Sequence, residues 1–159
     1  FVPKQEVVDF LLKLSVETQD HAFRFAVAKT LDQMHEKSPK LMMNRSRIKN
    51  EIAREVKIYK DFQKLILFLD HYGTQSENTK CLSVALQTLL DESLERLFHY
   101  LDLLYPQDIL HNIHAWIVEH PEADPVRQQA IELLSNTLES DILMIVGSVF
   151  ERKRKLCVP

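Results

Sequence analysis

Residues 124–134, with the sequence DPVRQQAIELL, predict a helix that has a defined start and one apolar face. Proline fits the first turn of a helix, where its missing N–H is not needed, and Asp124 just before Pro125 is a good N-cap. At 3.6 residues per turn, one face collects Val126, Ala130, Leu133 and Leu134. Because such a helix needs neighbours to cover that face, the segment predicts one member of a stacked set of helices.

The composition predicts one soluble globular domain. The chain has 159 residues, of which 45% are hydrophobic and 27% are charged, as is typical of a folded domain. Gly73 and Gly147 are its only glycines, which disfavours sheets joined by tight turns and excludes a glycine-rich phosphate loop. We expect a single domain over residues 1–159, cut from a longer protein, because the sequence lacks an initiator methionine and stops just after a basic cluster.

The spacing of apolar residues predicts seven helices and no strand. The first opens near Pro3, and the others are expected at residues 22–35, 45–71, 77–105, 108–119, from 124 onward and 141–152. Asn44 and Ser140 are the expected N-caps of the third and last helices. The third helix should bury Ile48, Ile52, Val56, Tyr59, Phe62, Ile66 and Leu69. The fourth should bury Val84, Leu86, Leu89, Leu90, Leu94, Leu97, Phe98, Leu101 and Leu104. Short turns between the helices favour antiparallel hairpins.

A weaker copy of the opening segment stands at residues 21–31, HAFRFAVAKTL, where Arg24 corresponds to Arg127. His21 takes the place of the aspartate, so Asp20 is the candidate cap of that helix. With these residues the chain resembles a HEAT-repeat or armadillo-like α-solenoid. The resemblance implies an all-α, right-handed solenoid of about seven helices, in which the aspartate caps a helix and the arginine links neighbouring repeats. It assigns these structural repeat roles to Asp124, Pro125, Arg127 and Arg24.

Residues 26–143 are also similar to the HEAT segments of large bacterial membrane proteins that join an ATP/ADP-translocase-like transporter domain to HEAT repeats. The similarity lies in residues 94–106, LERLFHYLDLLYP, and residues 130–138, AIELLSNTL. It implies a cytoplasmic module, which the rest of the polypeptide would hold at the cytoplasmic face of a membrane. The longest apolar runs of the chain itself, at 65–69 and 142–146, are far shorter than a bilayer span of about 20 residues.

Charge is distributed unevenly along the chain. Residues 37–64 carry nine Lys or Arg against three acids, a net charge of +6, whereas residues 91–141 carry eleven acids against two arginines, a net charge of −9. A concentrated basic helix is a candidate docking face, although an ordinary solvated face has the same composition. The residues expected to make an electrostatic contact are Lys49, Arg54, Lys57 and Lys60.

Few residues of the sequence suggest a catalytic or metal-binding site. His111 and His114 stand three positions apart on a predicted helix, where two imidazoles could share a metal ion. A zinc site needs three or four ligands, and the plausible additions are His99, Glu119 and His120, so two solvated histidines are the expected state. Most of the carboxylates at Asp91, Glu92, Glu95, Asp102 and Asp108 are expected on exposed helix faces, and the chain has no nucleophile elbow. We therefore predict no catalytic residue, no metal site and no cofactor.

The sequence thus favours a non-enzymatic scaffold that contacts another protein or another domain of the same polypeptide. Indirect association with a membrane and a purely structural spacer are further readings. The alternative from a different class is a HEAT-like nucleic-acid-binding or DNA-repair enzyme. A net charge of −3 disfavours it, because DNA binding calls for a broadly positive surface.

Overall fold

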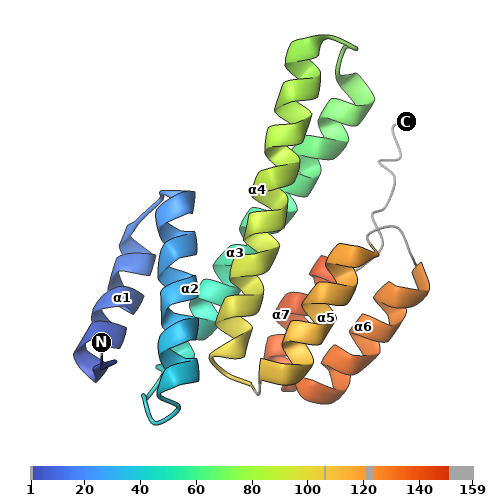
Figure 1. Ribbon diagram of the computed structural model, residues 1–159. Coiled ribbons are helices and arrows are strands. Elements are labelled where there is room, and N and C mark those ends of the chain that lie inside the picture. The colour runs from blue at the N-terminus through green and yellow to red at the C-terminus, as the bar shows by residue number, and fades with distance from the viewer. Residues whose placement is uncertain (1, 106, 121–123, 151–159) are drawn as a thin grey trace.

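The computed structural model describes residues 2–105, 107–120 and 124–150, which form seven α-helices and no β-strand (Figure 1). The helices are α1 (Gln5–Glu17), α2 (His21–Lys37), α3 (Arg45–Tyr72), α4 (Glu77–Asp102), α5 (Gln107–Glu119), α6 (Asp124–Thr137) and α7 (Ser140–Phe150). The predicted all-α class is confirmed. None of the described helices combines the length and the apolar character needed to cross a bilayer.

Side-chain caps fix the starts of three helices. The Asp20 carboxylate accepts a hydrogen bond from the backbone N–H three residues later, at 2.9 Å, and Asn44 does the same for α3 at 3.0 Å. Ser76 caps α4 in the same way at 3.2 Å. These bonds satisfy backbone N–H groups that have no partner within a helix. The predicted caps Asp20 and Asn44 are therefore confirmed.

Several predicted boundaries differ from the structure: α2 spans His21–Lys37 rather than residues 22–35, and α3 and α5 each differ from the prediction by one residue at one end. Helix α4 ends at Asp102 rather than at Tyr105, because the N–H groups of Leu104 and Tyr105 both donate to the carbonyl of Leu101 and close a tight turn. Ser140 was expected to be the N-cap that precedes the last helix, but it is the first helical residue of α7. Its predicted end near residue 152 lies outside the described residues.

The long α3–α4 hairpin is the centre of the molecule (Figure 1). Helices α1 and α2 cover one side of it, and α5 and α7 cover the other. Both α1 and α7 pack on α3, while both α2 and α5 pack on α4; α6 packs on α5 and α7. Helix α4 therefore lies between α2 and α5.

The main core fills the lower part of this arrangement, where all of the flanking helices meet the central hairpin. The first part of the stripe predicted for α3 is buried there, with Ile48 and Ile52 inaccessible to solvent, whereas Tyr59, Phe62 and Leu69 of the same stripe are only partly buried. Residues 62–90, here called the projecting hairpin, extend beyond the flanking helices (Figure 1). They are held by a separate small cluster of Ile66, Leu86 and Leu90. Val84 was expected in the stripe of α4 but is 67% exposed, because it lies on this projecting part.

Candidate functional site

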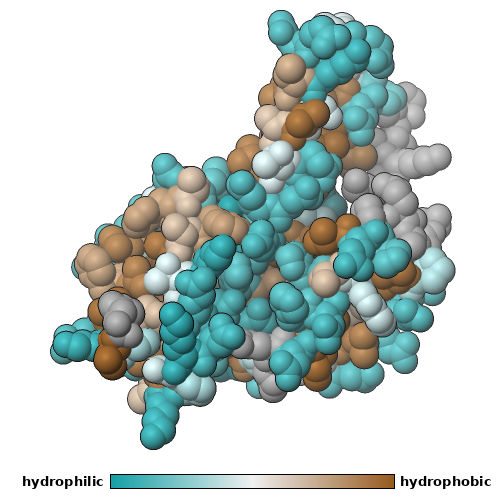
Figure 2. Space-filling view, in the orientation of Figure 1, coloured by the Kyte–Doolittle hydropathy of each residue, from teal (hydrophilic) through white to brown (hydrophobic). Residues whose placement is uncertain are grey.

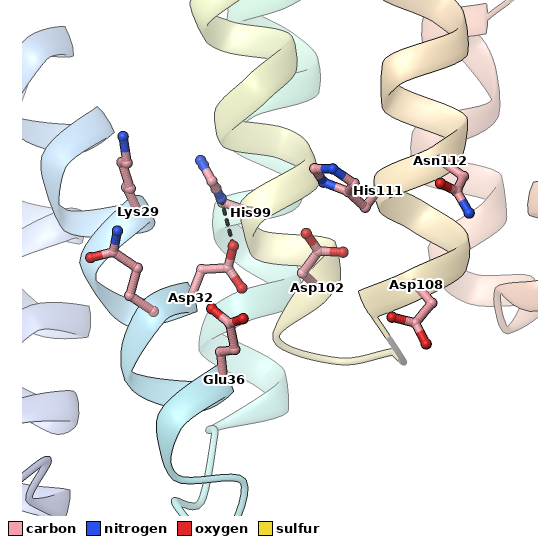
Figure 3. Close-up of a pocket in the computed structure, with 9 residues that line it drawn as sticks. Lys29, Asp32, Glu36, His99, Asp102, Asp108, His111 and Asn112 are labelled. Atoms are coloured by element: carbon pink, nitrogen blue, oxygen red, sulfur yellow. Dashed lines mark hydrogen bonds and ion pairs between the residues drawn. The ribbon is translucent and has the colours of Figure 1, made fainter.

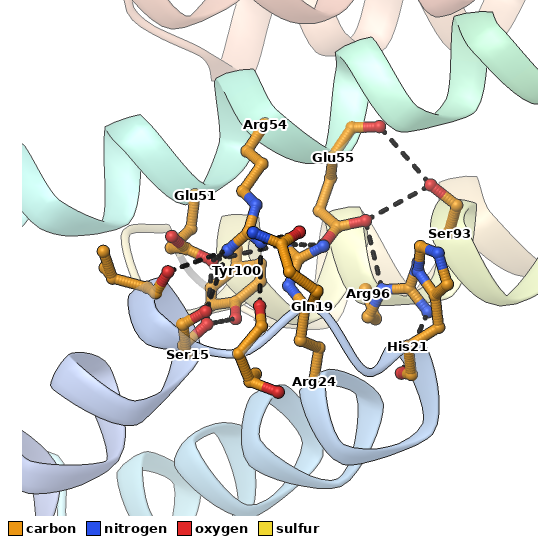
Figure 4. A network of polar contacts seen from close by, with 12 residues as sticks. Ser15, Gln19, His21, Arg24, Glu51, Arg54, Glu55, Ser93, Arg96 and Tyr100 are labelled. Carbon is orange, nitrogen blue, oxygen red and sulfur yellow. Dashed lines mark hydrogen bonds and ion pairs between the residues drawn. The ribbon is translucent and has the colours of Figure 1, made fainter.

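A buried cluster of charges joins four helices (Figure 4). Its charged members are Arg24 on α2, Glu51 and Glu55 on α3, and Arg96 on α4, each at most 3% exposed. Glu51 and Glu55 are four residues apart, so they share one face of α3. Two positive and two negative charges balance within the cluster, which is the condition under which charged groups are tolerated in a core.

The two arginines form ion pairs with the two carboxylates. Arg24 Nη2 lies 3.2 Å from Glu51 Oε2, and the same guanidinium forms an ion pair with Glu55 Oε1. Arg96 Nε donates to Glu55 Oε2 at 3.1 Å. Glu55 therefore bridges α2 and α4 through arginines on either side, and neither carboxylate is left without a charged partner.

Hydroxyl groups complete this buried cluster. Ser15 on α1 donates to Glu51 Oε2 at 2.7 Å, and its Oγ lies 2.6 Å from the Tyr100 hydroxyl on α4. Ser93 on α4 donates to Glu55 Oε2 at 3.2 Å. Burial raises the pKa of Tyr100 far above its ordinary value. With its acids paired and its phenol held protonated, the cluster supplies structural cross-links rather than reactive groups.

The residues assigned to repeat positions lie in different surroundings. Arg24 connects α2 to α3 through the buried cluster. Arg127 on α6 lies close enough to α3 for its charge to lower the pKa of Tyr59, against a larger increase caused by burial of that phenol. Pro125 is exposed in the first turn of α6, and the side chain of Asp124 lies outside the described residues. Their roles in a repeat stay a prediction.

The four predicted contact residues do not form one equivalent set. Lys49 Nζ donates to Asp141 Oδ2 on α7 at 2.8 Å. Arg54 donates to the carbonyls of Ser15 and Thr18 at 2.9 and 2.8 Å, and so closes the turn between α1 and α2. Lys57 is exposed and Lys60 is partly exposed, both on the outer side of α3.

The outer face of α3 continues past these lysines as an apolar surface. Leu65, Phe68 and Tyr72 are 49%, 55% and 57% exposed, and the rings of Phe68 and Tyr72 lie 4.9 Å apart. At 100° per residue, these three side chains follow the same side of the helix as Lys57 and Lys60. Toward the projecting hairpin, the outer face of α3 therefore changes from Lys57 and Lys60 to exposed apolar and aromatic residues. Figure 2 shows brown apolar residues interspersed with teal polar ones on the projecting hairpin.

A polar pocket of about 610 Å³ opens where α2, α4 and α5 meet (Figure 3). Asp32 reaches it from α2, His99 and Asp102 from α4, and His111 from α5. His99 Nδ1 lies 2.7 Å from Asp32 Oδ2, and His99 Nε2 lies 3.7 Å from Glu95 Oε1. The pocket is also lined by Lys29, Gln33, Glu36, Asp108 and Asn112.

Asp102 is the unusual residue of this pocket. It is only 7% exposed, and its Oδ1 has no hydrogen-bond partner among the described residues. Burial, together with the negative charge of Asp32, raises the pKa of Asp102 to about 7, while His99 acts in the opposite direction. A second carboxylate close by and the lack of a donor both disfavour its ionised form.

The two histidines singled out in the sequence have different surroundings in the structure. His111 is exposed and lines the pocket, whereas His114 packs on Phe98 with ring centroids 4.8 Å apart. Burial lowers the pKa of His114. His99, considered above as an additional ligand for His111 and His114, instead lies beside Asp32 and Asp102.

Sequence reasoning did not identify the aspartates of the pocket. His99 and Asp102 are three residues apart on a predicted helix, and this spacing is a visible signal for a shared face. Asp32 is 67 positions from His99 in the chain, so only the packing of α2 on α4 brings it into the same site. Comparison with protein-family models, curated proteins and solved structures finds no match to the chain, so its function is argued from these surfaces.

Proposed function

We propose that the chain is a non-enzymatic helical scaffold that binds an acidic surface of another protein, or of another domain, through the outer face of α3. The observation that carries this proposal is the row of Leu65, Phe68 and Tyr72, each about half exposed on a helix that also presents Lys57 and Lys60. Exposed aromatic residues beside cations are typical of the energetic centre of protein interfaces.

The placement of these residues favours a protein partner over an ordinary solvated face. Charged side chains on a solvated helix face are hydrated and need no partner. Three large apolar side chains in a row, by contrast, are exposed to water at a cost in free energy that burial against a partner would remove. Lys64 and Asp61 also lie on this side and pair with each other at 3.8 Å, which leaves Lys57 and Lys60 to supply the net positive charge. An acidic surface with an apolar centre complements such a face.

The solenoid interpretation belongs to the same proposal. Packing of α1 and α2 on the α3–α4 hairpin supports a HEAT-like arrangement, in which a scaffold extends by adding helical pairs. A right-handed sense of the solenoid is part of the proposal. One row of helices is α1, α3 and α7, and the other is α2, α4 and α5. On the far side of the hairpin the rows are therefore continued by α5 and α7 rather than by α5 and α6. We propose a cytoplasmic location for this scaffold, in keeping with the family resemblance.

A site-specific photo-crosslinker tests the proposal. A photoreactive phenylalanine analogue at position 68 should give a defined adduct with one protein whose crosslinked segment is acidic, while the same analogue at exposed position 9 on α1 should not. Binding of that purified partner should then weaken at least tenfold for the Lys57→Glu/Lys60→Glu variant and for Phe68→Ala. Tenfold corresponds to about 1.4 kcal/mol.

The matched control reverses two exposed lysines elsewhere, Lys4→Glu/Lys13→Glu, which changes the net charge equally. Its affinity for the partner should stay within about twofold of the wild type, with circular dichroism confirming the fold of every variant. Equal weakening by both double variants would show a general charge effect and contradict the docking face. Binding to anionic vesicles or duplex DNA that depends on Lys57 and Lys60, without a protein adduct at position 68, would assign the face to another occupant and reject the proposal.

A further inference from the structure

We propose that Asp32, His99 and Asp102 bind a divalent transition-metal ion, with zinc as the best match, at the junction of α2, α4 and α5 (Figure 3). This site is distinct from the outer face of α3 and does not depend on the scaffold proposal. One ring nitrogen of His99 and one carboxylate oxygen from each aspartate all lie within 4.8 Å of one another. Ligand atoms in a tetrahedral zinc site lie roughly 3.3 Å apart, so rotation of the side chains alone could close the set.

The helices position these ligands with little freedom. His99 and Asp102 are three residues apart on α4 and therefore project from the same face of one helix. Asp32 comes from α2, which packs directly on α4, and its carboxylate is already 2.7 Å from His99 Nδ1. A metal ion bound between these two groups would take the place of the hydrogen bond that now joins them.

Asp102 provides the independent evidence for a ligand. Its carboxylate is more than nine-tenths buried, points into the pocket between the helices (Figure 3), and leaves Oδ1 without a hydrogen-bond partner among the described residues. The buried acids Glu51 and Glu55 differ from Asp102, because each forms an ion pair with an arginine. No Lys or Arg of the described chain forms an ion pair with Asp102, so a bound cation would supply the missing partner.

The donor set selects the class of ion. Imidazole nitrogen together with carboxylate oxygen suits zinc and related divalent transition metals, whereas Mg²⁺ and Ca²⁺ prefer oxygen ligands throughout. His111 lines the same pocket from α5 but lies outside the group of ligand atoms within 4.8 Å of one another, so a water molecule is the expected fourth ligand. The side chains of His99 and Asp32 are 18% and 16% exposed, so an ion can reach them from solvent.

Zinc itself is the probe for the test. Purified protein is stripped with a chelator, and zinc binding is measured by competition with a chromogenic chelator and by the rise in melting temperature. Cobalt is then added in place of zinc, because its visible absorption reports tetrahedral coordination. We expect about one equivalent of zinc per chain, intense cobalt absorption, and a loss of affinity of at least tenfold for Asp102→Asn and for His99→Gln.

The control variant is Asp70→Asn/His71→Gln, which removes an aspartate and a histidine from the exposed end of α3 and should bind zinc as the wild type does. The conservative variant Asp102→Glu is included because it keeps the charge and should retain part of the affinity. Zinc uptake by wild-type protein that equals uptake by the triple variant Asp32→Asn/His99→Gln/Asp102→Asn would overturn the proposal. So would equal loss in the control, because the binding would then lie elsewhere. Circular dichroism shows whether each variant is folded.

Discussion

Glu51 and Glu55 occupy positions at which the helical period of α3 buries side chains, since they alternate with Ile48, Ile52 and Val56 on one face. A carboxylate at such a position is stable only when its charge is compensated, and Arg24 and Arg96 do this from α2 and α4. Removing one partner from a buried pair typically costs about 3–5 kcal/mol, because the remaining charge stays buried. The pairing therefore specifies which helices are neighbours more than it adds net stability.

His21 lies at the edge of this buried cluster, with its ring 5.6 Å from that of Phe62. Burial lowers the pKa of His21, and the positive charges of Arg96 and Arg24 lower it further, while Glu55 and Asp20 act in the opposite direction. The folded protein therefore binds fewer protons than the unfolded chain between the lowered pKa and the ordinary value of 6.5. Within that window the free energy of unfolding decreases as the pH falls.

We predict that His21→Gln reduces the loss of stability on acidification. The wild type should lose more stability than the variant between about pH 7.5 and pH 5.5, by at most about 1.4 kcal/mol per pH unit for one proton. Urea unfolding followed by circular dichroism at the two pH values measures the difference. The exposed variant His71→Gln is the control and should behave as the wild type. Parallel pH profiles for wild type and His21→Gln would contradict a lowered pKa for this partly buried imidazole.

The two glycines show opposite requirements at the level of the helix. Gly73 ends α3, and a Cβ there would lie 2.3 Å from the carbonyl oxygen of Leu69 and 2.9 Å from Thr79 Cγ2. Gly147 lies inside α7, where a Cβ would meet nothing within 4 Å. The carbonyl group beside Gly73 belongs to the backbone of α3 and cannot move aside as a flexible side chain can, whereas Gly147 has free space around it. The two sites should therefore respond differently to the same substitution.

We predict that Gly73→Ala destabilises the protein by about 1–3 kcal/mol, because the turn between α3 and α4 must shift. Gly147→Ala should instead stabilise it by about 0.5–1 kcal/mol, the gain in helix propensity of alanine over glycine. Chemical denaturation measures both changes in one background. Stabilisation by Gly73→Ala, or destabilisation by Gly147→Ala, would show that the space around that glycine differs from the structure.

The helices themselves were largely predictable from sequence, because their signals are local. Apolar spacing located all seven, and Asp20 and Asn44 were recognisable as caps from residue type and position. The end of α4 was placed too late, since the turn that stops it depends on backbone bonds to Leu101 rather than on periodicity. Val84 fits the apolar period, yet the prediction of burial failed because no flanking helix reaches that height of the hairpin.

The pocket could not be predicted, because it depends on the arrangement of the whole molecule. Asp32, His99 and His111 come from three helices, and they share a pocket because α2 and α5 pack on opposite sides of α4. A histidine and an aspartate three residues apart are visible in the sequence, but their partner on α2 is not. The same arrangement leaves the projecting hairpin without flanking helices, so stability should differ between the two parts of α3.

Two isoleucines of α3 test that difference. Ile52 lies in the main core and is inaccessible to solvent, whereas Ile66 belongs to the small cluster of the projecting hairpin. Ile52→Ala should lower the global free energy of unfolding by about 2–5 kcal/mol, the usual cost of deleting a buried isoleucine side chain. Ile66→Ala should mainly promote local opening, because few contacts connect the projecting hairpin to the rest of the core.

Hydrogen exchange distinguishes local from global opening. In Ile66→Ala, amide exchange should accelerate across residues 62–90 and remain close to wild type in α1, α2 and the first half of α3. In Ile52→Ala, the slowest amides of every described helix should accelerate together. Accelerated exchange throughout the protein in Ile66→Ala would mean that the projecting hairpin unfolds only with the main core. A loosely attached hairpin is also compatible with docking, because ordering of residues 62–90 on a bound partner would appear as slower exchange in the complex.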